Sequence, residues 1–138
     1  MRSIASRTVA AVAWTVPVLV VVQAAMIGRT LYGSSSLIGL HGSVGNLTFL
    51  LAVATLGMTW VTRRSGTALL LTFSSVLLLF AQTGTGYLGH RYGFSLASSV
   101  HIGLGVAIAA VSATAAMRLS GEQSALRRAV HPLSLIHI

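Results

Sequence analysis

The chain has 138 residues, of which 54% are hydrophobic and 7% are charged, and it contains nine basic residues, one acidic residue and no cysteine. A soluble domain carries about 25% charged residues, so this composition excludes a soluble globular enzyme, a disordered chain and a disulfide-stapled secreted domain. All nine basic residues are arginines, and they form no basic stripe with interleaved aromatics, which excludes a nucleic-acid partner. We therefore expect an integral membrane protein of one domain, in contact with lipid.

Four apolar runs are the main feature of the chain, at about residues 8–28, 37–61, 67–88 and 95–117. Each has about the 20 residues that a membrane-spanning helix needs, and none alternates with the period of a barrel strand. Pro17 interrupts the first run, which neighbouring helices tolerate in a membrane. Because the connections are short, we expect an all-α, up-down bundle of four transmembrane helices, forming a single domain over residues 1–132.

Both ends of the chain need separate interpretation. The last six residues, 133–138 (LSLIHI), resemble the translation of a transposon-end sequencing adaptor, and we expect them to be an artefact; the alternative is a genuine apolar tail. At the start, residues 1–7 are basic and precede an apolar run, as in a signal peptide. That run exceeds the typical length of about 7–15 residues, which favours an uncleaved first helix.

The arginines are distributed unequally between the two sides of the predicted bundle. Seven fall on the side of the termini and two on the other: Arg2, Arg7, Arg63, Arg64, Arg118, Arg127 and Arg128, against Arg29 and Arg91. The positive-inside rule then predicts that both termini are cytoplasmic and that loops 29–36 and 89–94 face out. Arginine without lysine favours a GC-rich bacterial genome, so we expect a multi-pass protein of the bacterial cytoplasmic membrane.

A weak internal repeat appears when the chain is displaced by sixty residues. The coinciding pairs are Tyr32-Gly33 with Tyr92-Gly93, His41 with His101 and Gly45 with Gly105, and Gln23 matches Gln82 one residue out of step. This pattern predicts two helical hairpins related by a pseudo-two-fold axis along the membrane normal. The second and fourth helices then lie diagonally opposite, where His41 and His101 can face each other.

The histidine pair is the strongest candidate for a functional site, because ionisable residues within apolar spans are commonly functional. A hydrogen-bonded interfacial histidine is the alternative for either residue alone. The chain has no cysteine or aspartate and only Glu122, so it lacks the ligands of a tetrahedral zinc or carboxylate-rich di-iron site. Two imidazoles suit a six-coordinate heme iron. Without a Cys-x-x-Cys-His motif, we expect non-covalent heme b with His41 and His101 as its axial metal ligands.

Glycines and polar residues surround these histidines in the sequence. The glycines are Gly42, Gly45, Gly103 and Gly105, with Gly84, Gly86 and Gly89 on the third run. They could make room for a flat macrocycle or let membrane helices pack closely. Arg29, Arg91, Tyr32 and Tyr92 could bind heme propionates or act as interfacial anchors. Gln23 and Gln82 are expected to hydrogen-bond across helices or to a ligand-bound water, and His90 to be solvated.

The segment 80–109, FAQTGTGYLGHRYGFSLASSVHIGLGVAIA, resembles one four-helix half of a heme A synthase. Uncharacterised half-sized relatives and small bacterial cytochrome b-like proteins share this pattern. The resemblance implies a four-helix bundle with histidines on its second and fourth helices, positions that His41 and His101 match. In the synthases a glutamate precedes the second-helix histidine by three residues and an arginine follows it directly. Ile38 and Gly42 stand there in this chain, so the resemblance implies heme holding rather than oxidation of a heme methyl group.

Three functions are compatible with the sequence. The first is a heme b protein that passes electrons near the outer face, to a redox partner or quinone, or that serves as a heme-holding subunit. Bis-histidine ligation leaves no open iron position, which favours electron transfer and not catalysis by the chain alone. The second is a cofactor-free scaffold or accessory subunit, and the third a small transporter or enzyme acting on a lipid or quinone. A lack of intramembrane carboxylates argues against proton-coupled transport. Two copies could also pair as a homodimer.

Overall fold

The computed structural model describes residues 2–31 and 37–130, and these residues form four α-helices. The helices are α1 (Arg2–Leu31), α2 (Leu37–Val61), α3 (Gly66–Tyr92) and α4 (Ser95–Val130). Each contains a segment long and apolar enough to cross a membrane, so the prediction of an all-helical, multi-pass membrane protein is confirmed at this level. Tyr32 and the suspected adaptor residues 133–138 lie outside the described residues.

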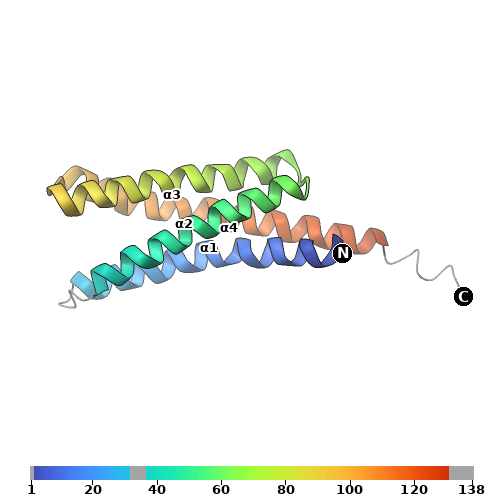
Figure 1. Ribbon diagram of the computed structural model, residues 1–138, viewed down its shortest axis with the longest axis horizontal. Helices are drawn as coiled ribbons and strands as arrows, with labels where there is room; N and C mark the ends of the chain where they lie inside the picture. Colours follow the sequence, from blue (N-terminus) through green and yellow to red (C-terminus); the bar gives the residue numbers. More distant parts are fainter. Residues whose placement is uncertain (1, 32–36, 131–138) are drawn as a thin grey trace, which may run out of the picture.

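Consecutive helices run in opposite directions, and Figure 1 shows them packed along a common axis. Helix α1 contacts α2 and α4, and α3 contacts the same two helices, whereas α2 and α4 are diagonal and their backbones do not approach each other. We call the end of the bundle where α1 passes to α2 and α3 passes to α4 the loop end. The opposite end, where α1 begins and α4 finishes, is the termini end (Figure 1).

Helices α1 and α4 are longer than the apolar runs from which they were predicted. Helix α2 coincides with the predicted 37–61, but α1 and α4 extend well past 8–28 and 95–117. A helix satisfies its backbone groups internally, so it can continue into polar sequence. Helix α1 continues to Leu31 and α3 to Tyr92, so the predicted starts of the two loops, at residues 29 and 89, were wrong, and His90 lies in the last turn of α3. Gly93 ends α3 in the left-handed conformation, with φ 70°, that favours glycine.

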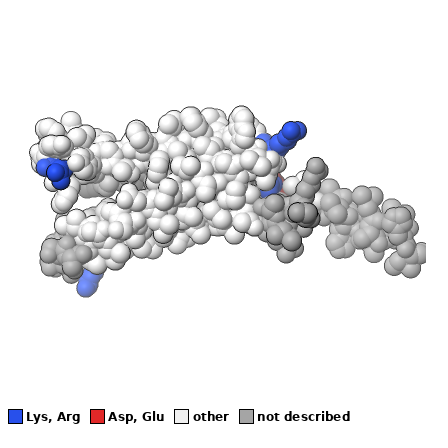
Figure 2. All heavy atoms as spheres, in the orientation of Figure 1, with Lys and Arg blue, Asp and Glu red and all other residues white. Residues whose placement is uncertain are grey.

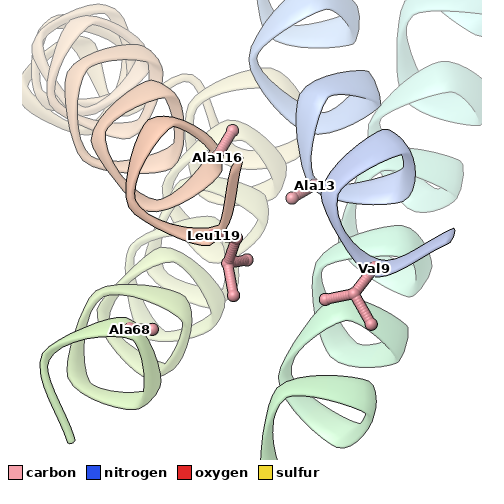
Figure 3. Close-up of a cluster of buried hydrophobic side chains, with 5 residues drawn as sticks. All are labelled: Val9, Ala13, Ala68, Ala116 and Leu119. Carbon is pink, nitrogen blue, oxygen red and sulfur yellow. The ribbon is translucent and has the colours of Figure 1, made fainter. Parts of the chain in front are cut away.

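Apolar side chains, four alanines among them, pack the helices together in the half of the bundle nearer the termini. One cluster comprises Val9, Ala13, Ala68, Ala116 and Leu119, drawn from α1, α3 and α4 (Figure 3), and a second comprises Val16, Val20, Ala52, Leu79 and Ile108. Without a hydrophobic driving force between helices in lipid, such small residues favour association because they allow close van der Waals contact. A cavity of about 10 Å³ remains beside Thr55 and Ser75, which is room for one water.

Hydroxyl side chains also lie in this core, and each has a hydrogen-bond partner. Thr48, Thr55, Thr59, Thr72, Ser75 and Ser112 are all buried and donate to the carbonyl four residues earlier in their own helix. This pattern satisfies the hydroxyl without a partner from another helix. The core of the termini half is therefore closely packed and has no unpaired hydroxyl among these residues.

The buried core ends about halfway along the bundle. The buried residues nearest the loop end are Val20, Thr48, Leu79 and Ile108. Among the described residues, none of 21–29, 37–47 or 80–107 is buried. Figure 1 shows that the α1–α2 and α3–α4 pairs diverge toward this end. The loop half is therefore much less tightly packed than the termini half.

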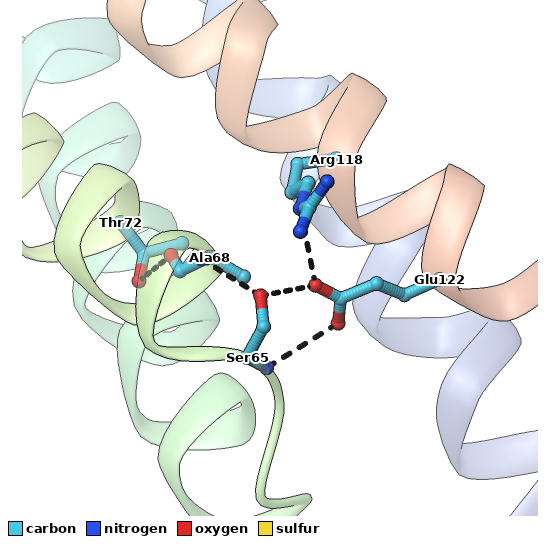
Figure 4. Close-up of polar contacts among 5 residues, drawn as sticks. All are labelled: Ser65, Ala68, Thr72, Arg118 and Glu122. Carbon is cyan, nitrogen blue, oxygen red and sulfur yellow. Dashed lines mark hydrogen bonds and ion pairs between the residues drawn. The ribbon is translucent and has the colours of Figure 1, made fainter.

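Charged residues lie at the two ends of the bundle, as Figure 2 shows for one face. At the termini end, Glu122 of α4 joins the turn between α2 and α3 (Figure 4). The hydroxyl of Ser65 hydrogen-bonds Glu122 Oε1 and also accepts from the N–H of Ala68 at 3.2 Å, which caps α3. Arg118 Nε lies 3.4 Å from the same carboxylate. The single acidic residue of the chain therefore fixes this turn to α4.

Candidate functional site

His41 of α2 and His101 of α4 lie side by side in the loop half of the bundle. Their ring centroids are 6.1 Å apart and their planes are inclined at 65°. Each histidine is in the second turn of its helix and is half-buried. The two helices are diagonal, so their backbones leave space between them and the two rings extend into it.

The two rings are held in the same way by the helices that precede them. His41 Nδ1 lies 3.2 Å from the carbonyl oxygen of Gln23, and His101 Nδ1 lies 2.8 Å from that of Gln82. A carbonyl can only accept a hydrogen bond, so each Nδ1 carries the proton that it donates. In a neutral ring the lone pair is then on Nε2. Metal-ligating histidines characteristically donate their other N–H to such a carbonyl, which fixes the tautomer and the ring orientation.

The glutamine side chains make different contacts in the two hairpins. The Gln23 amide nitrogen donates to the hydroxyl of Thr48 at 3.1 Å. The Gln82 amide nitrogen instead lies 3.3 Å from His101 Nε2, which accepts from it because Nδ1 holds the ring proton. The Gln82 Oε1 atom is buried and has no hydrogen-bond partner. Both glutamines therefore hydrogen-bond to a neighbouring helix, as expected, and Gln82 bonds to a histidine.

Gly45 and Gly105 provide space for these glutamines. A Cβ at Gly45 would lie 3.1 Å from Gln23 Oε1, and one at Gly105 would lie 3.5 Å from Gln82 Nε2. Gly45 and Gly105 therefore lie against the glutamine amides. A Cβ at Gly42, Gly84 or Gly103 would meet nothing within 4 Å.

Gly86 is the glycine on which the geometry of the site depends most. A Cβ there would lie 2.7 Å from Cε1 and 2.9 Å from Nδ1 of His101, so the ring rests directly on the backbone of α3. Sequence analysis placed Gly86 only among several small residues. Its spacing of four residues from Gln82, one helical turn, was the available signal for this role.

The remaining predicted residues that the structure describes lie at the loop end of the bundle. Arg29 and Arg91 are exposed in the last turns of α1 and α3. The Arg91 guanidinium is 6.0 Å from the centroid of the Tyr87 ring, and Tyr92 contacts the same ring edge-on with centroids 6.1 Å apart. His90 is exposed beside them, as expected of a solvated histidine, although it lies in a helix.

Among the described residues, His41 and His101 offer two ring nitrogens to a metal. Within residues 2–31 and 37–130, no group of three or more histidine, cysteine, aspartate or glutamate side chains could hold a metal ion. The site therefore presents two imidazole rings, each with Nδ1 donating to a backbone carbonyl.

Comparisons with known proteins add no assignment to this geometry. No protein-family model, curated protein or solved structure matches the chain.

Proposed function

We propose that the chain is a membrane protein that binds heme b, with Nε2 of His41 and Nε2 of His101 as the two axial ligands of the iron. The observation that carries the proposal is the matched pair of imidazoles, each with Nδ1 on a backbone carbonyl and its lone pair on Nε2. This tautomer is the one that a metal-ligating histidine with a carbonyl partner adopts.

The spacing of the rings supports the same assignment. Metal–imidazole bonds are about 2 Å long, so an iron held by Nε2 of both residues would require ring centroids about 6 Å apart. The centroids of His41 and His101 are separated by 6.1 Å. Two imidazoles alone leave four positions on an octahedral iron, and a porphyrin supplies those four as a planar set.

The surroundings fit a macrocycle better than a bare ion. The described residues of the loop half contain no buried side chain, whereas the termini half is filled by its own small residues. Arg29 and Arg91 lie at the loop end, where they could pair with propionates at the water interface. Tyr92, at the same end, would also bind the propionates. When bound, a heme with two axial imidazoles supplies one-electron transfer, since no coordination position stays open.

The finer architecture belongs to the same proposal. In each hairpin a glutamine carbonyl accepts from the histidine of the following helix, which supports a pseudo-two-fold repeat of α1–α2 and α3–α4. The arginine distribution favours a bacterial cytoplasmic membrane with both termini inside, so the loop end would face out. The proposal agrees with the sequence resemblance to a non-catalytic half of heme A synthase, since Ile38 and Gly42 stand in place of the acidic and basic residues of the reaction site.

Titration of the detergent-purified protein with hemin tests the proposal. We expect saturation at one heme per chain and a low-spin spectrum that both His41→Ala and His101→Ala abolish. The matched control is His90→Ala, because His90 is an exposed histidine of the same end that contacts neither ring. Uptake that persists unchanged in all three variants would contradict the ligand assignment. A wild type that binds no hemin would favour a cofactor-free scaffold.

A further inference from the structure

The two histidines are not equivalent, because only one has its Nε2 atom engaged. The Gln82 amide nitrogen lies 3.3 Å from Nε2 of His101. In the other hairpin the Gln23 amide is bonded to Thr48, and no described residue hydrogen-bonds Nε2 of His41. The lone pair of His41 is therefore available, and that of His101 is shared with an amide proton.

A single difference between the hairpins accounts for this asymmetry. Thr48 supplies the hydroxyl that takes up the Gln23 amide. Sixty residues later stands Ile108, whose side chain is 1% exposed and offers no acceptor. The amide nitrogen of Gln82 instead contacts Nε2 of His101.

The Gln82 side chain is also incompletely satisfied in this position. Its Oε1 is buried without a partner, which is costly for an amide oxygen removed from water. The side chain is therefore held by one contact of 3.3 Å and by its fit beside Gly105. Displacing the side chain of Gln82 therefore costs this one hydrogen bond and no other.

We propose that Gln82 is a positioning residue that caps Nε2 of His101 until a metal takes that lone pair, which makes His41 the primary ligand and His101 the exchangeable one. One lone pair cannot both accept from an amide and bind a metal, so ligation by His101 must break the contact with Gln82. Ligation by His41 breaks no hydrogen bond within the described chain. This inference rests on the proposed function, since it concerns the same two ligands.

The test compares Gln82→Leu with Gln23→Leu, which makes the same change in the other hairpin. Leucine keeps the bulk of glutamine and removes the amide donor. We expect hemin to bind Gln82→Leu about five- to tenfold more tightly than wild type, because one competing hydrogen bond is lost. Gln23→Leu should bind no more tightly than wild type. Ile108→Thr gives Gln82 the hydroxyl partner that Gln23 has, and it should shift the dissociation constant in the same direction as Gln82→Leu.

A readout without heme separates this inference from the proposed function. In ¹H–¹⁵N spectra of the ligand-free protein, Gln82→Leu should shift His101 Nε2 toward the value of a nitrogen without a hydrogen bond, and Gln23→Leu should not. Equal hemin dissociation constants in wild type and Gln82→Leu, with an unshifted His101 resonance, would overturn the role of Gln82 alone. Failure of the wild type to bind hemin would overturn the proposed function and this inference together.

Discussion

Replacing Gly86 by alanine should displace His101 and weaken both the fold and the heme site. The new Cβ would stand 2.7 Å from Cε1 of His101, whereas carbon atoms in contact are about 3.5–4.0 Å apart. The ring must therefore retreat by about 1 Å, which stretches its 2.8 Å hydrogen bond to the Gln82 carbonyl beyond hydrogen-bonding distance. Overpacking costs about 1–3 kcal/mol and the lost hydrogen bond about 1 kcal/mol, against a gain of about 1 kcal/mol for alanine over glycine in a helix.

The matched control for this variant is Gly84→Ala, two residues earlier in the same helix, where a Cβ would meet nothing within 4 Å. It should gain the helix propensity without the clash, so the two variants should differ by about 2–4 kcal/mol in unfolding free energy. Thermal unfolding in detergent measures this difference. Loss of the hydrogen bond from His101 to the Gln82 carbonyl should also weaken hemin binding about 10- to 100-fold, in Gly86→Ala only. Equal stability and equal hemin affinity in the two variants would refute the reasoning.

The termini end offers two further tests. Glu122→Ala removes the carboxylate that holds Ser65 and should cost about 1–3 kcal/mol in unfolding free energy. Arg118→Ala should cost no more than about 0.5 kcal/mol, because the Arg118 side chain is 52% exposed. Comparable losses of unfolding free energy in the two variants would show that the carboxylate does not anchor the turn. For topology, the chain has no native cysteine, so an impermeant thiol reagent applied to intact cells should label Ser95→Cys and spare Ser124→Cys. The reverse labelling would invert the proposed orientation.

Hydropathy located the helices well but not their ends. The apolar run 37–61 coincides with α2, because polar residues flank the run on both sides in the sequence. Helix α4 runs to Val130, beyond the predicted end at residue 117, since backbone hydrogen bonding continues wherever no breaker intervenes. His90 and Arg91 were placed in a loop for the same reason: a change in hydropathy was read as the end of α3.

Only those features of the site that the two hairpins share could be predicted from the sequence. The sixty-residue repeat identified His41 and His101 as partners, and the two rings lie 6.1 Å apart. The repeat could not reveal the contacts that differ between the hairpins, such as the amide of Gln82 on His101. The contact of the His101 ring with Gly86 depends on the distance between α3 and α4, which no local pattern in the sequence encodes.

The most direct test of the account is a reduced-minus-oxidised visible spectrum of the protein purified from cells grown with ample heme. The account predicts a sharp low-spin b-type spectrum in the wild type and in His90→Ala. The same spectrum should be lost in His41→Ala and in His101→Ala. A colourless wild type under full heme supply, or an unchanged spectrum in both ligand variants, would contradict the claim that the two imidazoles hold a heme.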